Sequence, residues 1–254
     1  MQIYPTDTST LLSTSLTDSQ WAKIENLFDN RKRKHSLREM VNALFYITKS
    51  GIQWRMLPKE YPKWQLVYYY FRKWTGEGLI EEMHDLLYSI CRKQAGRALS
   101  PSLGLIDSQS VKTSSMTSEK GYDGGKKIQG RKRHIVTDTL GLIMAVVIHS
   151  AEVQDREGAK AVIEQLRYRF PRLKKILADG GYTGELIEQV LKGFGWTLEI
   201  VHKVVGISGF NLLPKRWVVE RTFGWFTMRI LWFANSRYLS NRCRSCCSSD
   251  IKYK

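Results

Sequence analysis

The sequence has no long apolar run and no secretory signal. The longest clean apolar stretch, residues 142–148, is far shorter than the roughly 20 residues that a membrane-spanning helix needs. The first 15 residues contain neither a basic start nor an apolar core, so they do not form a signal peptide. We therefore expect a protein that does not cross or enter a membrane and stays in the cytoplasm.

Cysteine is also scarce, with 4 residues in a chain of 254. Three of them, Cys243, Cys246 and Cys247, are crowded near the end, which is not the paired framework of a secreted protein. A single Cys-x-x-Cys without a second pair is also a poor zinc site. The cysteines therefore indicate neither a disulfide scaffold nor a zinc finger.

Acidic residues are outnumbered by basic ones. The chain has 40 Lys and Arg against 24 Asp and Glu, a formal net charge of +16 and a pI near 9.7. Such an excess favours a polyanionic partner, above all nucleic acid. The alternative is a basic protein with no such partner, and charge alone does not separate the two.

Three acidic residues nevertheless stand in settings that point to chemistry. Asp107 in LGLIDSQSVK and Asp179 in KKILADGGYTG each close an apolar run typical of a buried strand, whereas Glu220 in KRWVVERTFGW lies in a helical segment. A buried carboxylate is costly unless a cation compensates it, and three carboxylates repel one another until a positive charge lies between them. The pattern predicts a magnesium site.

Other polar residues fit structural roles better. Asp123 and Asp138 lie in turn sequences, and Asp155 precedes a helix, where an aspartate is ordinarily a cap. His134 and His149 occupy strand positions and are expected to be packed, because histidine suits zinc better than magnesium. For Glu220 the alternative is a surface salt bridge to Arg216, four residues earlier.

The first part of the chain is predicted to be helical. Residues 1–15 are polar and are expected to form a disordered tail, and residues 16–98 a helical domain. Helices are expected from Thr17 or Asp18 through WAKIENLF, from Ser36 to Gly51, and in two pieces broken around Gly76 and Gly78. This region is either a helix-turn-helix module that recognises DNA or a helical cap on a catalytic domain.

Residues 99–228 alternate between strands and helices. The expected order is a strand, a hairpin through residues 139–141, a helix from Asp155, a strand, a helix, a strand and a final helix. This order predicts an α/β fold with a mixed sheet flanked by helices.

Basic residues surround the three acids. One group lies between the first two strands and is expected to contact phosphate, with a solvated loop as the alternative. It comprises Lys126, Lys127, Arg131, Lys132 and Arg133. A second group flanks the carboxylates and is expected to hold a DNA strand by charge. It comprises Lys112, Lys215, Arg216 and Arg221.

The chain resembles the DDE transposases of bacterial insertion sequences, specifically the insertion-sequence-5-like group within the insertion-sequence-4 superfamily. The acidic motifs carry the resemblance together with SLTDSQWAKIENLF, GIQWRMLP, GRKRHIVTDTLGL and DREGA, in that family's order. It implies a ribonuclease-H-like catalytic core behind a helical domain that recognises the ends of the element. It also implies cleavage and strand transfer of double-stranded DNA at terminal inverted repeats and target DNA, in a bacterial, nucleoid-associated protein.

The resemblance further implies the roles of the three acids. Asp107 would bridge two Mg²⁺ ions, for which Mn²⁺ can substitute, while Asp179 would hold one ion and Glu220 the other. Because two ends of an element must be held together, we also expect a homodimer on DNA.

The resemblance ends after Trp225. Residues 229–254 are basic, rich in cysteine and without helical periodicity, which we interpret as the product of a reading-frame shift. An altered tail leaves open a second function, a catalytically impaired DNA-binding remnant that occupies the ends of the element. A third alternative is a ribonuclease-H-like nuclease unrelated to transposition.

Overall fold

A computed structural model describes residues 15–113, 120–201 and 216–227 of the chain. Contacts within the chain divide it into two compact units, one up to Cys91 and one from Arg92 onward, and each is described by itself. Residues 1–14 and 229–254 of the expected tails, as well as Lys215, lie outside the described residues. Within those described ranges, no helix is long and apolar enough to cross a membrane.

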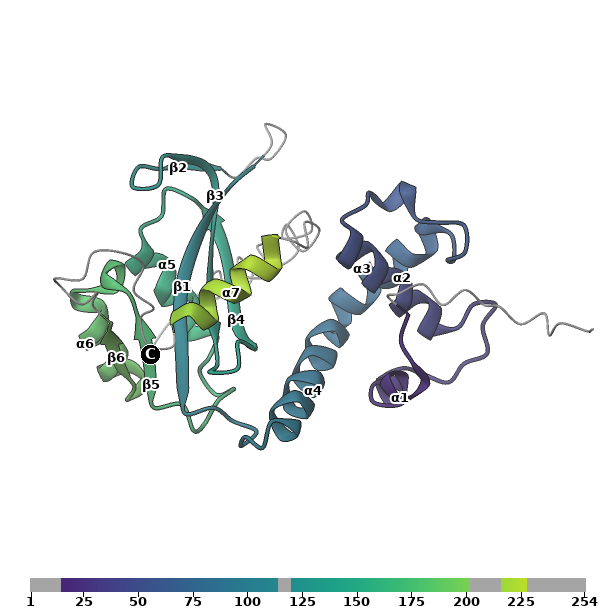
Figure 1. The fold of residues 1–254 in the computed structure, drawn as a ribbon, viewed down its shortest axis with the longest axis horizontal. Helices are drawn as coiled ribbons and strands as arrows, with labels where there is room; N and C mark the ends of the chain where they lie inside the picture. The colour runs from purple at the N-terminus through teal and green to yellow at the C-terminus, as the bar shows by residue number, and fades with distance from the viewer. Residues whose placement is uncertain (1–14, 114–119, 202–215, 228–254) are drawn as a thin grey trace, which may run out of the picture. The chain divides into compact units, whose positions relative to one another are not determined.

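All regular structure in the described part of the first unit is helical (Figure 1). It comprises α1 (Asp18–Trp21), η1 (Glu25–Leu27), α2 (Leu37–Ser50), η2 (Trp54–Met56), α3 (Trp64–Glu77) and α4 (Leu79–Gln94), the last of which continues into the second unit.

Local sequence explains where these helices begin and end. Thr17 and Gln20 form a capping box on α1, and the Ser36 hydroxyl accepts a hydrogen bond from the Glu39 amide at the start of α2. Gly51 and Gly78, with φ of 76° and 81°, end α2 and α3 in the left-handed conformation that glycine adopts without strain. The predicted caps and the break at Gly78 are confirmed. The first helix is shorter than predicted, because the chain turns after Trp21 and continues as η1.

Apolar residues of α2 and α3 form the core of this unit. The apolar residues Leu37, Met40, Val41, Leu44 and Ile47 recur at helical spacing on α2; all are buried except Leu44, which is half-buried against the same core. Phe28 contacts the Trp74 ring edge-on, with their centroids 5.0 Å apart. The fully buried members of this core are Ile24, Phe28, Leu37, Met40, Val41, Ala43, Ile47, Val67 and Trp74.

The second unit is built on a six-stranded mixed sheet (Figure 1). Its strands are β1 (Leu103–Lys112), β2 (Gly121–Asp123), β3 (Ile128–Thr137), β4 (Ile143–Ser150), β5 (Lys175–Ala178) and β6 (Thr197–Ile200). The order is β2-β3-β1-β5-β6, with β4 also paired to β3. β1 is antiparallel to β3 and parallel to β5, so it lies at the centre of the sheet.

Helices cover both faces of this sheet. α5 (Asp155–Glu164) packs on β3 and β4, and α7 (Arg216–Thr227) packs on β1 and β3. Neighbouring strand residues point to opposite faces. His134 of β3 lies under Gly158 of α5, whereas Arg133 contacts Phe223 of α7, so the two helices lie on opposite faces. α6 (Glu185–Phe194) packs on β6.

The predicted order of strands and helices in this unit is confirmed, and so is the mixed α/β class. β3 and β4 form the predicted hairpin, whose Gly141 has a φ of 86°. The short strand β2 was not predicted, because a three-residue pairing leaves no periodicity in the sequence.

Gly158 of α5 allows the helix to approach the sheet closely. A Cβ at this position would lie 2.4 Å from Nε2 of His134 and 2.5 Å from Nε2 of His149, well inside van der Waals contact. The two imidazole rings are stacked with centroids 4.9 Å apart, so both would have to move. Glycine is therefore required here by space.

We expect Gly158→Ala to lower the free energy of unfolding by about 1–3 kcal/mol, the usual cost of overpacking a core. Gly193→Ala in α6 is the matched control, because no atom lies within 4 Å of the added methyl group. Alanine also favours a helix by up to about 1 kcal/mol, so this control should be neutral or stabilising. Urea denaturation of both variants checks this, and equal stability of the two would contradict the packing argument.

Candidate active site

Asp107 lies in the middle of the sheet, on the central strand β1. Its side chain is buried, and its Oδ1 accepts a hydrogen bond from the Ser108 backbone N–H at 2.7 Å. In the antiparallel register Asp107 pairs with Ile135 and Gln109 pairs with Arg133. Because Arg133 contacts α7, Asp107 shares that face of the sheet.

Asp179 follows directly after the neighbouring strand β5. β1 and β5 are parallel with Leu105 opposite Leu177, and each aspartate comes two residues further along its own strand. The register therefore brings Asp107, in the middle of β1, beside Asp179, just past the end of β5. Asp179 also caps η3 (Gly180–Tyr182), where its Oδ1 accepts a hydrogen bond from the Gly181 N–H at 2.9 Å.

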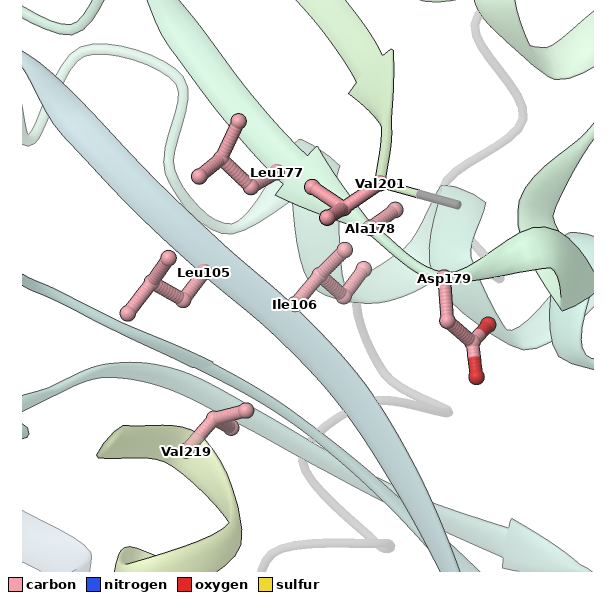
Figure 2. Close-up of a pocket in the computed structure, with 7 residues that line it drawn as sticks. All are labelled: Leu105, Ile106, Leu177, Ala178, Asp179, Val201 and Val219. Carbon is pink, nitrogen blue, oxygen red and sulfur yellow. The ribbon is translucent and has the colours of Figure 1, made fainter. Parts of the chain in front are cut away.

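Glu220 comes from the helix that covers this part of the sheet. Val219 and Phe223 of α7 are buried, whereas Glu220 and Gly224, four residues apart on one face, are exposed. Val219 lines a small apolar pocket whose wall ends at Asp179 (Figure 2). The other lining residues are Leu105, Ile106, Leu177, Ala178 and Val201. α7 thus brings the residue before Glu220 to the end of β5.

Within the described residues, no three acidic, histidine or cysteine side chains are close enough to hold one metal ion. Asp107, which lies inside β1 rather than at its end as expected, and Asp179 supply carboxylate oxygens, which are the ligands that Mg²⁺ prefers. The third predicted ligand, Glu220, is on an exposed surface of α7. The donor chemistry therefore fits a magnesium site at Asp107 and Asp179, and the roles of the three acids remain a prediction.

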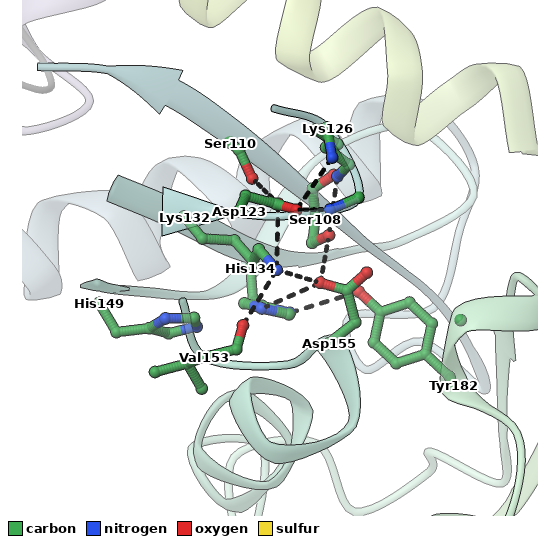
Figure 3. Close-up of polar contacts among 12 residues, drawn as sticks. Ser108, Ser110, Asp123, Lys126, Lys132, His134, His149, Val153, Asp155 and Tyr182 are labelled. Carbon is green, nitrogen blue, oxygen red and sulfur yellow. Dashed lines mark hydrogen bonds and ion pairs between the residues drawn. The ribbon is translucent and has the colours of Figure 1, made fainter. Parts of the chain in front are cut away.

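A buried polar cluster lies on the other face of the sheet, under α5 (Figure 3). At its centre the Lys132 ammonium is 3.0 Å from Asp155 Oδ1 and 3.3 Å from Asp123 Oδ2, and it donates to the Val153 carbonyl. The hydroxyl of Ser108 donates to Asp155 at 2.9 Å. Although Asp155 begins α5, its side chain does not cap the helix.

The pKa values in this cluster follow from burial and from these partners. Burial would raise the pKa of the Asp123 carboxyl, but hydrogen bonds from Ser110, the Lys126 amide and Lys132 outweigh it and lower the pKa to about 2. Burial would also raise the pKa of the Asp155 carboxyl, but the hydrogen bonds from Lys132 and Ser108 outweigh burial and lower this pKa. Both carboxylates are therefore ionised at neutral pH.

Two histidines and a tyrosine complete the cluster. Burial and the neighbouring His149 lower the pKa of His134 to about 3, and burial lowers the pKa of His149. Burial, followed by the charges of Asp107 and Asp155, raises the pKa of Tyr182 well above its usual value. The Tyr182 hydroxyl lies 3.3 Å from His134 Nδ1. Both histidines are packed and neutral, as predicted.

Asp123 and Asp138 occupy turns, as predicted. Asp123 Oδ1 accepts from the Gly125 and Lys126 amides, and Asp138 Oδ1 accepts from the Leu140 and Leu142 amides. Asp138 is also fully buried in an ion pair with Arg92. Its turn supports α7 as well, because the Thr222 hydroxyl and the Arg221 guanidinium donate to the Gly141 and Leu140 carbonyls.

The basic residues predicted to contact phosphate divide into two groups. Lys112, Lys126 and Lys127 are exposed, and Lys126 also donates to the Ser108 carbonyl. Arg131, Lys132 and Arg133 are buried at 7%, 5% and 2% exposure. The low exposure of these three side chains on β3 does not favour the expected contacts with phosphate. Arg221 stacks on Trp217 with its guanidinium carbon 4.6 Å from the ring centroid.

The cluster around Asp155 was missed in the sequence, where Asp155 was interpreted as a cap. A signal was present in LGLIDSQSVK, because Ser108 and Ser110 place two hydroxyls on one face of a buried strand. The side chains that they bind, Asp155 and Asp123, come from distant positions, so the sequence alone did not identify the partners.

Comparisons with known proteins find transposases, and the first family match below runs to residue 243, so the expectation that the resemblance ends after Trp225 was wrong. Residues 98–243 match a family model described as "Transposase DDE domain", and residues 16–84 match one described as "Putative transposase of IS4/5 family". A protein of Burkholderia cepacia named "Putative transposase for insertion sequence element IS402" is 31% identical over 103 residues. That match covers 38% of this chain and 48% of the relative, so the chain spans about half of that relative's length.

The buried histidine predicts a pH dependence of stability. Below pH 6.5 the unfolded chain binds a proton at His134 that the folded protein does not take up until about pH 3. Stability is therefore full above pH 6.5 and decreases as the pH falls, by up to about 1.4 kcal/mol for each pH unit from this group. Asp123 adds a further loss below its unfolded pKa of 3.8.

Urea denaturation between pH 7 and pH 5 measures this loss. His134→Asn should be less stable at pH 7 but should show a shallower decrease toward pH 5. His84→Asn, at a partly exposed position on α4, is the control and should keep the wild-type slope. An unchanged slope in His134→Asn would rule out this histidine as the source.

Proposed function

This chain belongs to the DDE transposases of the insertion-sequence-4/5 type, and we propose that it cleaves DNA at the terminal inverted repeats of an insertion sequence and transfers the strands to target DNA. The observation that supports the proposal is the parallel register of β1 and β5, which puts Asp107 beside Asp179 on neighbouring strands. Ligands commonly bind at the strand ends of α/β sheets. The strand order β4-β3-β1-β5-β6 supports a ribonuclease-H-like core over residues 99–228.

We assign the cation-binding role to Asp107 and Asp179, with Glu220 as the third acid. A divalent metal ion, Mg²⁺ by preference, would lower the pKa of the attacking oxygen and stabilise the leaving one. The chain's own part is to hold its carboxylates in place. The Ser108 amide fixes the orientation of Asp107, and the Gly181 amide fixes that of Asp179. Asp107 lies inside the buried strand β1, and Asp179 follows the buried Ala178 at the end of β5, so both carboxylates are preorganised.

DNA is expected to be held by residues of both units. Within the helical region 16–98, the exposed Tyr69 on α3 and the exposed basic residues before α2 support recognition of the element's ends. Near the proposed active site, Lys112, Lys126 and Lys127 are exposed and can contact phosphate without reading sequence. Two ends must be joined in one reaction, which favours a homodimer on DNA.

Asp107→Ala tests the catalytic assignment. We expect at least about a thousandfold loss of Mg²⁺-dependent cleavage of an inverted-repeat duplex, because a metal ion contributes several kcal/mol to the transition state. Binding of the same duplex should stay within about twofold, because phosphate contacts come from other residues. Cleavage assays and electrophoretic mobility shifts measure the two quantities.

Glu199→Ala, which removes an exposed carboxylate paired with Lys175, is the matched control and should retain cleavage. Retained cleavage in Asp107→Ala would overturn the assignment. A wild-type protein that binds the repeats and never cuts them, with Mg²⁺ or Mn²⁺, would select the DNA-binding remnant instead. The basic, cysteine-rich sequence at residues 229–254 gives that second function its support.

Lys127→Ala tests the proposed phosphate contacts. Losing one such contact should weaken DNA binding similarly for all sequences and reduce the slope of log affinity against log salt by about 1. Lys192→Ala is the control, since this exposed lysine pairs with Glu188 on α6. Binding titrations at several salt concentrations measure the slope, and identical slopes in both variants would exclude Lys127 from the interface.

A further inference from the structure

Asp155 is connected to Asp107 by two hydrogen bonds through one serine. Its Oδ1 accepts from the Ser108 hydroxyl at 2.9 Å (Figure 3), and the Ser108 backbone N–H donates to Asp107 Oδ1 at 2.7 Å. Ser108 therefore has its side chain fixed on one face of β1 while its amide orients a carboxylate on the other. A movement of Asp155 would be transmitted to Asp107 through this residue.

The other oxygen of Asp155 lies on the side of Asp179. A Cβ at Gly181 would be 3.4 Å from Asp155 Oδ2 and 3.1 Å from Asp179 Oδ1, so both oxygens border the same small space. The Asp155 side chain is 25% exposed, which leaves this space accessible to solvent. The two aspartates of the proposed site thus have Asp155 as a common neighbour.

Lys132 fixes the Asp155 carboxylate in this orientation. Its ammonium contacts Asp155 Oδ1 at 3.0 Å and is itself held by Asp123 at 3.3 Å and by the Val153 carbonyl at 2.9 Å. Lys132 is 5% exposed, so these contacts are shielded from water and stronger than surface ion pairs. Ser108 and Lys132 both contact Oδ1 of Asp155, and Oδ2 is turned toward Asp179.

We propose that Asp155 is a positioning residue of the active site. Through Ser108 it orients the Asp107 carboxylate, and through Oδ2 it adds a negative charge beside Asp179 that favours a bound divalent cation. This inference rests on the proposed function, because a cation at Asp107 and Asp179 is what the added charge stabilises. Neighbours that orient metal ligands commonly change metal affinity by about 10- to 100-fold when they are removed.

A purely structural role is the alternative, in which the cluster only attaches α5 to the sheet. Asp123 separates the two. It shares Lys132 with Asp155 and also accepts a hydrogen bond from a β1 serine, Ser110, although its side chain is more buried, at 9% against 25% exposure. Its Oδ1 accepts from the amides of the turn after β2, and its Oδ2 binds Ser110 and Lys132. Asp123→Asn is therefore a matched control for the loss of a charge next to Lys132.

The test compares Asp155→Asn with Asp123→Asn in the full chain. Asparagine keeps an oxygen that can accept from serine and removes the charge. Mn²⁺ binding without DNA, followed by electron paramagnetic resonance, and the Mg²⁺ concentration for half-maximal cleavage are measured beside thermal stability. We expect both variants to lose similar stability, Asp155→Asn to need about tenfold more cation, and Asp123→Asn to stay within about twofold of wild type.

Each outcome decides the proposal. Equal cation dependence in Asp155→Asn and wild type, or equal weakening in both variants, would overturn it. If Asp155→Asn does not fold, Ser108→Ala breaks the same link and should raise the cation requirement several-fold, whereas an unchanged requirement would overturn the link. If the wild-type protein binds no Mn²⁺ and Asp107→Ala behaves in the same way, the proposed function itself would be overturned.

Discussion

The ion cluster around Lys132 is the interaction on which the arrangement of this unit depends. A buried ammonium is costly unless it is paired, and here two carboxylates and a carbonyl surround it. These partners come from β2, from the start of α5 and from the loop before it, while Lys132 belongs to β3. One charge on β3 therefore ties the start of α5 and the loop before it to the sheet, and joins them to β2. Removing it would leave two partly or fully buried carboxylates without a cationic partner in this cluster.

The cluster and the proposed active site lie on opposite faces of one strand. β1 alternates between the faces, so that Asp107 points toward the side covered by α7 and Ser108 toward the side covered by α5. A central strand that is polar on both sides is unusual in a buried sheet, where apolar runs are the norm. Here each polar side chain has a partner, and the strand can carry a carboxylate without an open path for water through the core.

Much of the fold was predictable from the sequence, because its signals are local. Thr17, Ser36, Gly51 and Gly78 determine helix ends through their own backbone and side-chain chemistry, and the structure confirms them. Apolar runs identified the strands that precede Asp107 and Asp179. Which residues lie next to these aspartates, and which way the basic side chains of β3 point, depend on contacts between segments that are far apart in the sequence. Residues 131–133 look like an exposed basic run in the sequence, and only the pairing of β3 with strands on both sides shows that they are buried.

The turn at Asp138–Leu142 is a shared anchor for two helices with different tasks. Arg92, near the end of α4, pairs with Asp138, while Arg221 and Thr222 of α7 donate to the carbonyls at positions 140 and 141. α4 continues into the first unit, and α7 carries Glu220. One short turn thus holds both the last turn of α4 and the middle of α7, so a substitution at Asp138 would disturb the packing of both helices.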